Sequence, residues 1–253
     1  MTRVGGSVAV LAAMWLLSAC GQPQGEAEKG QGAAQATVTT QKPDANHPIV
    51  VELYQSQGCS SCPPANANLN RIADRDDVIA LSFAVTYWDD LGWKDRFADP
   101  AFTRRQRDFA DANGRAQVWT PQMVVNGEAE TLTGVKRDVF DARIDAARGL
   151  SGGPSISGDG KAVALGAADG GPATVWLVRY DPAERDVAIA AGENAGRTLP
   201  HRNIVRSLVA LGEWHGDAVD WALPPAAEPG LSSAILVQRG KGGPIIAARR
   251  IDG

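Results

Sequence analysis

Short apolar runs alternate in the first half of the chain with segments whose apolar residues recur at helical spacing. Residues 49–54 and 78–85 are apolar and rich in β-branched side chains, and the second run is continuous, as in a strand that helices cover on both faces. Between them, the apolar positions of residues 65–72 lie on one helical face. The pattern predicts a β-α-β unit with parallel strands.

Caps and turns mark the elements that follow. Asp99 and Pro100 suit the N-cap and first position of a helix, and an Asn-Gly turn at residues 126–127 invites a hairpin. The predicted elements are a helix over 99–114, a short strand that ends at Val125, a returning strand over 130–132 and a helix within 134–149.

The character of the chain changes at residues 152–154. Short strand-like runs follow at regular spacing, separated by Gly, Pro, Asp and Asn, which is typical of an antiparallel sandwich or sheet. These runs are 156–157, 162–165, 174–180, 187–190, 233–239 and 245–249. We therefore expect residues 48–150 to be an α/β domain and residues 151–253 to be a second, mainly-β domain.

The N-terminus has the form of a targeting segment. Residues 1–19 contain Arg3 and a short apolar run, as in a secretory signal peptide, and Leu17-Ser18-Ala19-Cys20 resembles the bacterial lipobox. This predicts a lipid on Cys20 that anchors the protein to a membrane; an ordinary signal peptide with an incidental cysteine is the alternative. The remainder of 20–47 is polar and predicts a flexible tether, with the folded part on the periplasmic side. In a Gram-negative cell, Gly21 after Cys20 favours the outer membrane.

With Cys20 assigned to the lipid, Cys59 and Cys62 remain as a Cys-x-x-Cys pair in an oxidising compartment. The sequence offers neither a second cysteine pair nor closely spaced histidines to complete a zinc site, so no metal is predicted. The pair precedes a helix that we expect to start near Ser61 or Cys62. The dipole of that helix lowers the pKa of the Cys59 thiol and favours a thiolate, and Cys62 is then the resolving thiol. A structural disulfide is the alternative.

Composition restricts the function classes. The chain has 253 residues, of which 44% are hydrophobic and 21% charged, and its formal net charge is -4. A nucleic-acid partner is excluded, because it needs a dense basic face and no Lys/Arg block is present. No hydrolase elbow, phosphate loop or dinucleotide fingerprint occurs, so no cofactor is predicted. Four arginines are interpreted as a solvated helix face or, alternatively, as a basic surface that favours a thiolate: Arg96, Arg104, Arg105 and Arg107.

The order of elements around the cysteines resembles the thioredoxin fold, in which a cis-proline lies against the redox pair. Pro121 takes that position. The resemblance implies a cis Thr120–Pro121 bond, with the backbone of Thr120 open to hydrogen bonds from a partner in mixed disulfide. The chain also resembles DUF1223, a family of secreted thioredoxin-like proteins of unknown function, which implies an α/β thioredoxin-like domain but no substrate. The blocks that carry this resemblance are residues 52–65, 87–95 and 120–127.

Two further segments are candidates for the site. In residues 87–93, Trp88 and Trp93 either form a substrate platform beside the cysteines or belong to a loop packed onto the domain. In the first case, Asp89 or Asp90 moves protons for the buried thiol. Residues 192–203 are dense in polar groups and are either a binding site that faces the redox pair or a loop held by its own contacts. The residues of that site are Glu193, Arg197 and His201.

The leading hypothesis is a membrane-anchored thiol-disulfide oxidoreductase that acts on the thiols or disulfides of other extracytoplasmic proteins. Cys59 attacks a target disulfide as a thiolate and Cys62 resolves the mixed disulfide; in reverse, the pair oxidises a target. The hypothesis requires that a partner reach the sulfur of Cys59. The alternatives are a binding lipoprotein with a structural Cys59–Cys62 disulfide and, less favoured, a copper(I) carrier that uses both thiolates.

Overall fold

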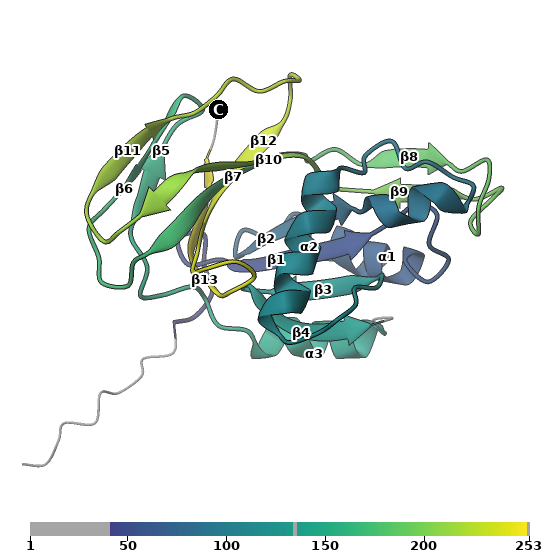
Figure 1. Ribbon diagram of the computed structural model, residues 1–253, viewed down its shortest axis with the longest axis horizontal. Helices are drawn as coiled ribbons and strands as arrows, with labels where there is room; N and C mark the ends of the chain where they lie inside the picture. Colours follow the sequence, from purple (N-terminus) through teal and green to yellow (C-terminus); the bar gives the residue numbers. More distant parts are fainter. Residues whose placement is uncertain (1–40, 134–135, 252–253) are drawn as a thin grey trace, which may run out of the picture. The chain divides into compact units, whose positions relative to one another are not determined.

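The computed structural model describes residues 41–133 and 136–251, and its first elements form the β-α-β unit (Figure 1). Strands β1 (Ile49–Gln55) and β2 (Val78–Ala84) pair in parallel, and α1 (Pro63–Ile72) connects them. The helix begins just after Cys62, its N-cap, because two prolines occupy its first positions. Their fixed φ suits a first turn, whose amide hydrogens lack helical partners in any case.

The next elements complete the first half of the molecule. The side chain of Asp99 accepts a hydrogen bond from the amide of Ala101 at 2.7 Å, which confirms the predicted N-cap of the second helix. The elements are η1 (Thr86–Leu91), a 3-10 helix, α2 (Pro100–Ala112), β3 (Gln122–Val125), β4 (Glu128–Thr133) and α3 (Arg137–Ala146). Strand β3 is antiparallel to both β1 and β4.

The described part of the second half contains only strands and loops. In chain order, the strands are β5 (Ile156–Gly158), β6 (Ala162–Leu165), β7 (Ala173–Asp181), β8 (Arg185–Ala188), β9 (Thr198–His201), β10 (Ile204–Trp214), β11 (Val219–Ala222), β12 (Ser232–Gln238) and β13 (Ile245–Ile251). The sequence patterns did not indicate β9, β10 or β11. Strands β8 and β9 form a separate antiparallel hairpin.

One sheet runs through both halves. Among the described residues, eight strands follow the order β13-β12-β7-β10-β2-β1-β3-β4. The junction is the parallel pairing of β10 with β2, at Ile204 and Ser82. An open edge of β2 would leave backbone donors and acceptors unpaired, and β10 occupies it. The boundary predicted near residue 150 therefore does not separate two sheets, and the described residues belong to a single compact unit.

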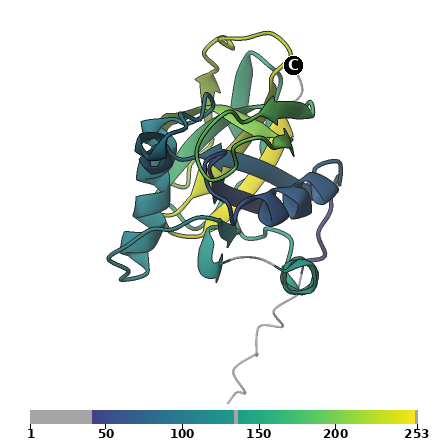
Figure 2. The same ribbon diagram turned by 90° about the vertical axis from the view of Figure 1, so that its right-hand side faces the viewer.

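Helices cover both faces of the part of the sheet that contains β1. Because side chains alternate along a strand, Val50 and Tyr54 pack toward α2, whereas Ile49, Val51 and Leu53 pack toward α1 and α3. Figures 1 and 2 show α2 on one side of the sheet and α1 on the other. Packing on both faces fixes the position of the end of β1, and the two cysteines come shortly after that end in the chain.

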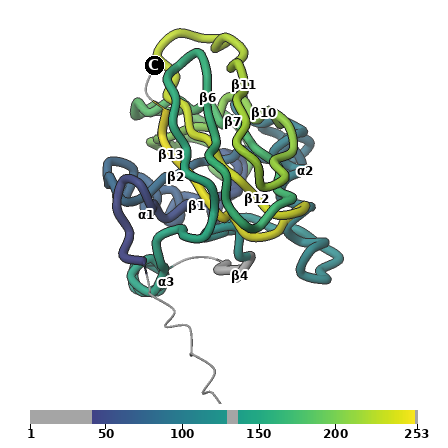
Figure 3. Tube along the Cα trace, turned by 90° about the vertical axis from the view of Figure 1, so that its left-hand side faces the viewer, coloured from purple at the N-terminus to yellow at the C-terminus, as the bar shows by residue number. Residues whose placement is uncertain are grey.

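A smaller sheet, in the order β11-β6-β5, covers one face of the other half (Figure 3). Val163 and Leu165 of this sheet share a buried cluster with Val175 and Leu177 of β7. The mainly-β region is thus two packed layers, of which one is part of the large sheet.

Candidate active site around the Cys59–Cys62 disulfide

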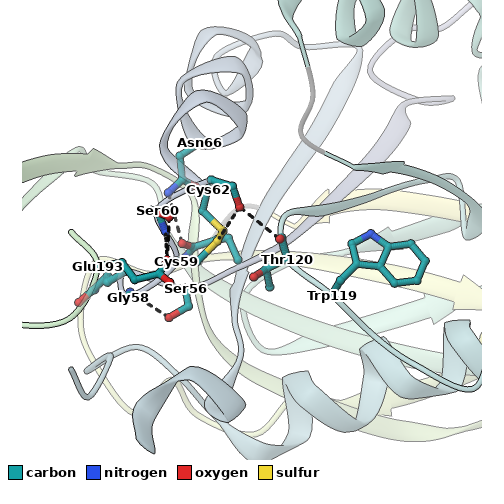
Figure 4. The surroundings of a disulfide bond; sticks show 12 residues. Ser56, Gly58, Cys59, Ser60, Cys62, Asn66, Trp119, Thr120 and Glu193 are labelled. Atoms are coloured by element: carbon teal, nitrogen blue, oxygen red, sulfur yellow. Dashed lines mark hydrogen bonds between the residues drawn. A yellow bond between two sulfur atoms is a disulfide. The ribbon is translucent and has the colours of Figure 1, made fainter. Parts of the chain in front are cut away.

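Cys59 and Cys62 form a disulfide at the carboxyl end of β1, immediately before α1 (Figure 4). Two successive turns hold them: the amide of Cys59 donates to the carbonyl of Ser56, and the amide of Cys62 donates to the carbonyl of Cys59, both at 3.2 Å. Cys59 therefore precedes the N-cap by three residues. The dipole effect expected for Cys59 is weaker at this distance, because it falls off within the first turn of a helix.

The loop before Cys59 is fixed by groups that follow β2. The amide of Gln57 donates to Oδ2 of Asp95 and the amide of Phe97 to Oδ1, each at 2.9 Å. Asp95 is buried, and this burial raises its pKa from 3.8 to about 6 against the opposing effect of the two backbone hydrogen bonds. Nε1 of Trp93 donates to Oε1 of Gln57 at 2.9 Å, and Trp88 lies beside Gly58.

The peptide bond between Thr120 and Pro121 is cis, as the resemblance to the thioredoxin fold implies. Ser61 is one of the two residues between the cysteines, and its Oγ donates to the carbonyl oxygen of Thr120 at 3.4 Å and lies 3.3 Å from Sγ of Cys59. The loop before β3 therefore lies next to the disulfide, on the side opposite Glu193 in Figure 4.

The tip of hairpin β8–β9 lies against the cysteines, although it is more than 130 residues away in sequence. Glu193 accepts hydrogen bonds from the amide of Ser60 at 3.0 Å and from its hydroxyl at 2.7 Å. The hydrogen bond from the hydroxyl of Ser60 lowers the pKa of Glu193 most, and the bond from its amide lowers it further. Glu193 is therefore a carboxylate at neutral pH. Asn194, fully buried, donates to the carbonyls of Gln57 and Cys59 at 2.8 Å each, and its Oδ1 accepts from Arg197 at 2.7 Å.

His201, at the end of β9, contacts Asn66 of α1. Its Nδ1 is 3.1 Å from Nδ2 of Asn66, which also donates to Oε1 of Gln55 at 3.3 Å. Burial, with a smaller contribution from Arg96, lowers the pKa of His201 from 6.5 to about 4. The imidazole is therefore neutral at physiological pH and accepts at Nδ1.

Both cysteines are buried, with exposed fractions of 0% for Cys59 and 1% for Cys62. The oxidoreductase hypothesis requires access to Cys59, so this closed state is the main difference between the expected and the observed site. Ser60 and Ser61 between them are exposed, which places the disulfide just beneath the surface.

The candidate residues thus fall into two groups. The first group lies at the Cys-x-x-Cys turn or its preceding loop and consists of Thr120, Pro121, Trp88, Trp93 and Glu193. The second group is one step further away. Arg197 and His201 reach the turn through Asn194 and Asn66, and Asp89 accepts a hydrogen bond from the amide of Asp95. Sequence reasoning did not single out Gln57, Asp95 or Asn194. Asn194 stood within the polar segment 192–203, but asparagine is common in turns and gave no signal of its own.

The described residues also bear on the predictions about metals and membranes. Residues 41–133 and 136–251 contain no group of three His, Cys, Asp or Glu side chains arranged to hold a metal ion. No helix among the described residues has the length and apolar character needed to cross a bilayer. Cys20 and the predicted signal peptide lie outside the described residues.

Fold and site together define a mixed α/β protein with a Cys-x-x-Cys disulfide enclosed at the end of a central strand. The chain belongs to DUF1223, a family of proteins of unknown function, whose model matches residues 50–238. It is similar to the crystal structure of protein AGR_C_4864 from Agrobacterium tumefaciens, with 31% identity and a TM-score of 0.66 over 84% of this chain and 96% of that one.

A second solved structure, HBP35 of Porphyromonas gingivalis, has 11% identity and a TM-score of 0.56, over 83% of this chain and 76% of that one. At this identity the likeness concerns the fold alone. None of the curated proteins compared matches the chain.

Proposed function

We propose that this protein is a thiol-disulfide oxidoreductase with a thioredoxin-like region around Cys59 and Cys62. The observation that carries the proposal is the position of the disulfide, between the end of a central strand and the start of a helix, with the backbone of Thr120 beside it. A pair that is only three residues apart at a helix start is the arrangement in which disulfides exchange with external thiols.

The chemistry is a reversible exchange of two electrons. In the oxidised form, a thiolate of a substrate dithiol attacks Sγ of Cys59, the Cys59–Cys62 bond breaks, and Cys62 leaves as a thiolate that takes up a proton. The second substrate thiolate then attacks the mixed disulfide, which releases Cys59 and leaves the substrate oxidised. In reverse, the reduced pair breaks a substrate disulfide by the same steps.

The proposed substrates are thiols and disulfides of other extracytoplasmic proteins. We also propose that residues 1–19 are removed as a signal peptide and that a lipid on Cys20 anchors the protein to a membrane, with residues 21–47 as tether. The lipobox-like sequence supports this. Substitution Cys20→Ser is expected to move the protein from the membrane fraction to the soluble extracytoplasmic fraction; an unchanged membrane fraction would contradict the anchor.

An insulin-reduction assay tests the exchange. The full chain is expected to accelerate reduction of insulin by dithiothreitol, Cys59→Ser to abolish the acceleration, and Cys62→Ser to trap mixed disulfides with substrates, because the resolving thiol is lost. The matched control is Cys20→Ser, which removes the remaining cysteine and leaves the pair intact. Full exchange by Cys59→Ser would eliminate the proposal.

The burial of both cysteines favours a second candidate, a binding lipoprotein in which the disulfide is structural. The two candidates differ in reduction potential. Structural disulfides have potentials below about -300 mV, whereas the proposed enzyme is expected in the range of about -270 to -120 mV of known exchange proteins. Equilibration of the pair with glutathione or dithiothreitol buffers measures this directly.

A further inference from the structure

We infer that residues 192–197, the tip of hairpin β8–β9, are a cap that controls the access of partner thiols to Cys59, and that Asn194 is the residue that holds the cap closed. The inference rests on the proposed function, because only an exchanging disulfide needs access. It reconciles that function with the burial of both cysteines.

Hydrogen bonds from two side chains hold the cap against the turn that contains Cys59. Asn194 binds the carbonyls on both sides of Gly58, and Glu193 binds the amide and hydroxyl of Ser60. These bonds engage the backbone at Cys59 and at the residue that follows it. A partner thiol that approaches the exposed Ser60 side of the turn therefore meets the cap first.

The cap is built to move as one piece. Its backbone is bonded to itself and to the hairpin, from Ala195 to Gly192, from Arg197 to Asn194 and from Gly196 to Ile189, at 2.8–3.2 Å. Gly192 and Gly196 have φ of +75° and +79°, a left-handed conformation that glycine adopts without strain. Release of the side chains of Asn194 and Glu193 frees the tip without breaking these internal bonds.

The base of the hairpin is anchored differently. Val187, Ile189 and Leu199 are buried in an apolar cluster with Ala84 and Ile204. Apolar packing of this kind persists when a few polar contacts are lost. The hairpin thus has a fixed base. Its tip is held against the cysteines by the side chains of Asn194 and Glu193, and Gly192 also approaches Trp93 closely. In Figure 1 it projects away from the large sheet as a separate ribbon.

The test measures how fast the disulfide of the full chain reacts with dithiothreitol, by acid quenching, alkylation and intact mass. A reagent thiolate attacks Cys59 and Cys62 leaves; the second reagent thiol then releases Cys59 and closes the reagent's own disulfide, so two electrons reach the pair. Reoxidation by oxidised dithiothreitol gives the reverse rate. If the cap opens and closes faster than the thiols react and is mostly closed, the rates of reduction and reoxidation are both proportional to the fraction of molecules with an open cap.

Asn194→Ala is expected to raise both rate constants by about tenfold, the factor that corresponds to about 1.4 kcal/mol of lost net hydrogen bonding. Glu193→Gln, measured at high salt so that its charge is screened, is expected to raise both rates by roughly threefold. The ratio of the two rates, which is the equilibrium constant, stays unchanged. The matched control is Asp186→Asn, the same type of change at an exposed position of β8.

Equal rates in Asn194→Ala, Glu193→Gln and wild type would contradict the proposal that the tip of the hairpin controls access. So would an increase in reduction alone, because the residues would then alter the stability of the disulfide rather than access to it. Far-UV circular dichroism and the urea midpoint verify that each variant is folded. If Asn194→Ala does not fold, Glu193→Gln still provides the test, because Glu193 is at an exposed position. Because the reagents are small molecules, these rates are informative even if insulin is not a substrate.

Discussion

Two buried residues near the disulfide, Asp95 and His201, have opposite effects on the pH dependence of stability. Burial raises the pKa of Asp95 from 3.8 to about 6, so the folded state binds the proton more tightly than the unfolded state. Its contribution to the free energy of unfolding is therefore present below about pH 4 and is lost as the pH rises through 6. One pKa unit corresponds to 1.36 kcal/mol, so the loss amounts to about 3 kcal/mol.

His201 has the reverse sign. Burial lowers its pKa from 6.5 to about 4, so the unfolded state binds the proton more tightly. Its contribution is present above pH 6.5 and is lost as the pH falls through 4, again by about 3 kcal/mol. Between pH 4 and 6 the two contributions offset each other in the wild-type protein.

Variants at each position separate these contributions. Relative to wild type, Asp95→Asn is expected to lose about 1 kcal/mol more stability per pH unit as the pH falls from 6 to 4, because only the His201 contribution remains. His201→Gln is expected to lose less than wild type over the same range. Urea unfolding at intervals of half a pH unit measures both slopes, and all other carboxylates cancel in the comparison. Slopes parallel to that of wild type in both variants would show that neither group is perturbed.

At the scale of elements, local signals were sufficient where an element has a regular pattern or a cap. Strands β1 and β2 are largely apolar runs, and Asp99-Pro100 marks the start of α2. Strand β10 had no such signal. Its pairing with β7 contains two register shifts, between Val205 and Ser207 and between Ala210 and Gly212. Each shift breaks the alternation of buried and exposed side chains on which recognition of a strand depends.

Arg105 of α2 shows a second limit of local patterns. The sequence suggested a solvated or basic helix face, but Arg105 is buried and binds both carboxylate oxygens of Glu52 in β1 at 2.7 Å. Its Nη1 also donates to Gln238 of β12, and Tyr54 donates to Glu52. The partners are 53 and 133 residues away, so the helix sequence alone does not reveal them.

This buried network makes Arg105 an important contributor to stability. Arg105→Ala leaves Glu52 buried without its partner, and we expect a loss of about 3–5 kcal/mol in the free energy of unfolding. Arg104→Ala, at the adjacent exposed position, is the control and is expected to change stability by less than about 0.5 kcal/mol. Urea denaturation of both variants measures the difference. A loss below about 1 kcal/mol in Arg105→Ala would show that the network is well hydrated in solution.

At the scale of the whole molecule, the site combines segments that the chain order keeps apart. The cysteines follow β1, Thr120 and Pro121 precede β3, and Glu193 and Asn194 come from hairpin β8–β9. The sequence identified the first two through the Cys-x-x-Cys spacing and the resemblance to the thioredoxin fold. For the third it left two interpretations of residues 192–203 open, a site that faces the cysteines or a loop held by its own contacts. The contact of the third with the cysteines depends on β10 pairing with β2, a long-range contact without a local pattern.

The continuous sheet also determines how the protein unfolds. Phe83 and Phe102 share one buried cluster with Val178, Tyr180 and Leu236 from the second half, so neither half has a core of its own on that face. We expect thermal unfolding to show a single transition, coincident by tryptophan fluorescence and far-UV circular dichroism. A fragment of residues 48–150 is expected to show no cooperative transition, because it exposes this cluster and the edge of β2. Two separated transitions in the full chain, with a cooperatively folded fragment, would instead establish two independent domains joined at residue 150.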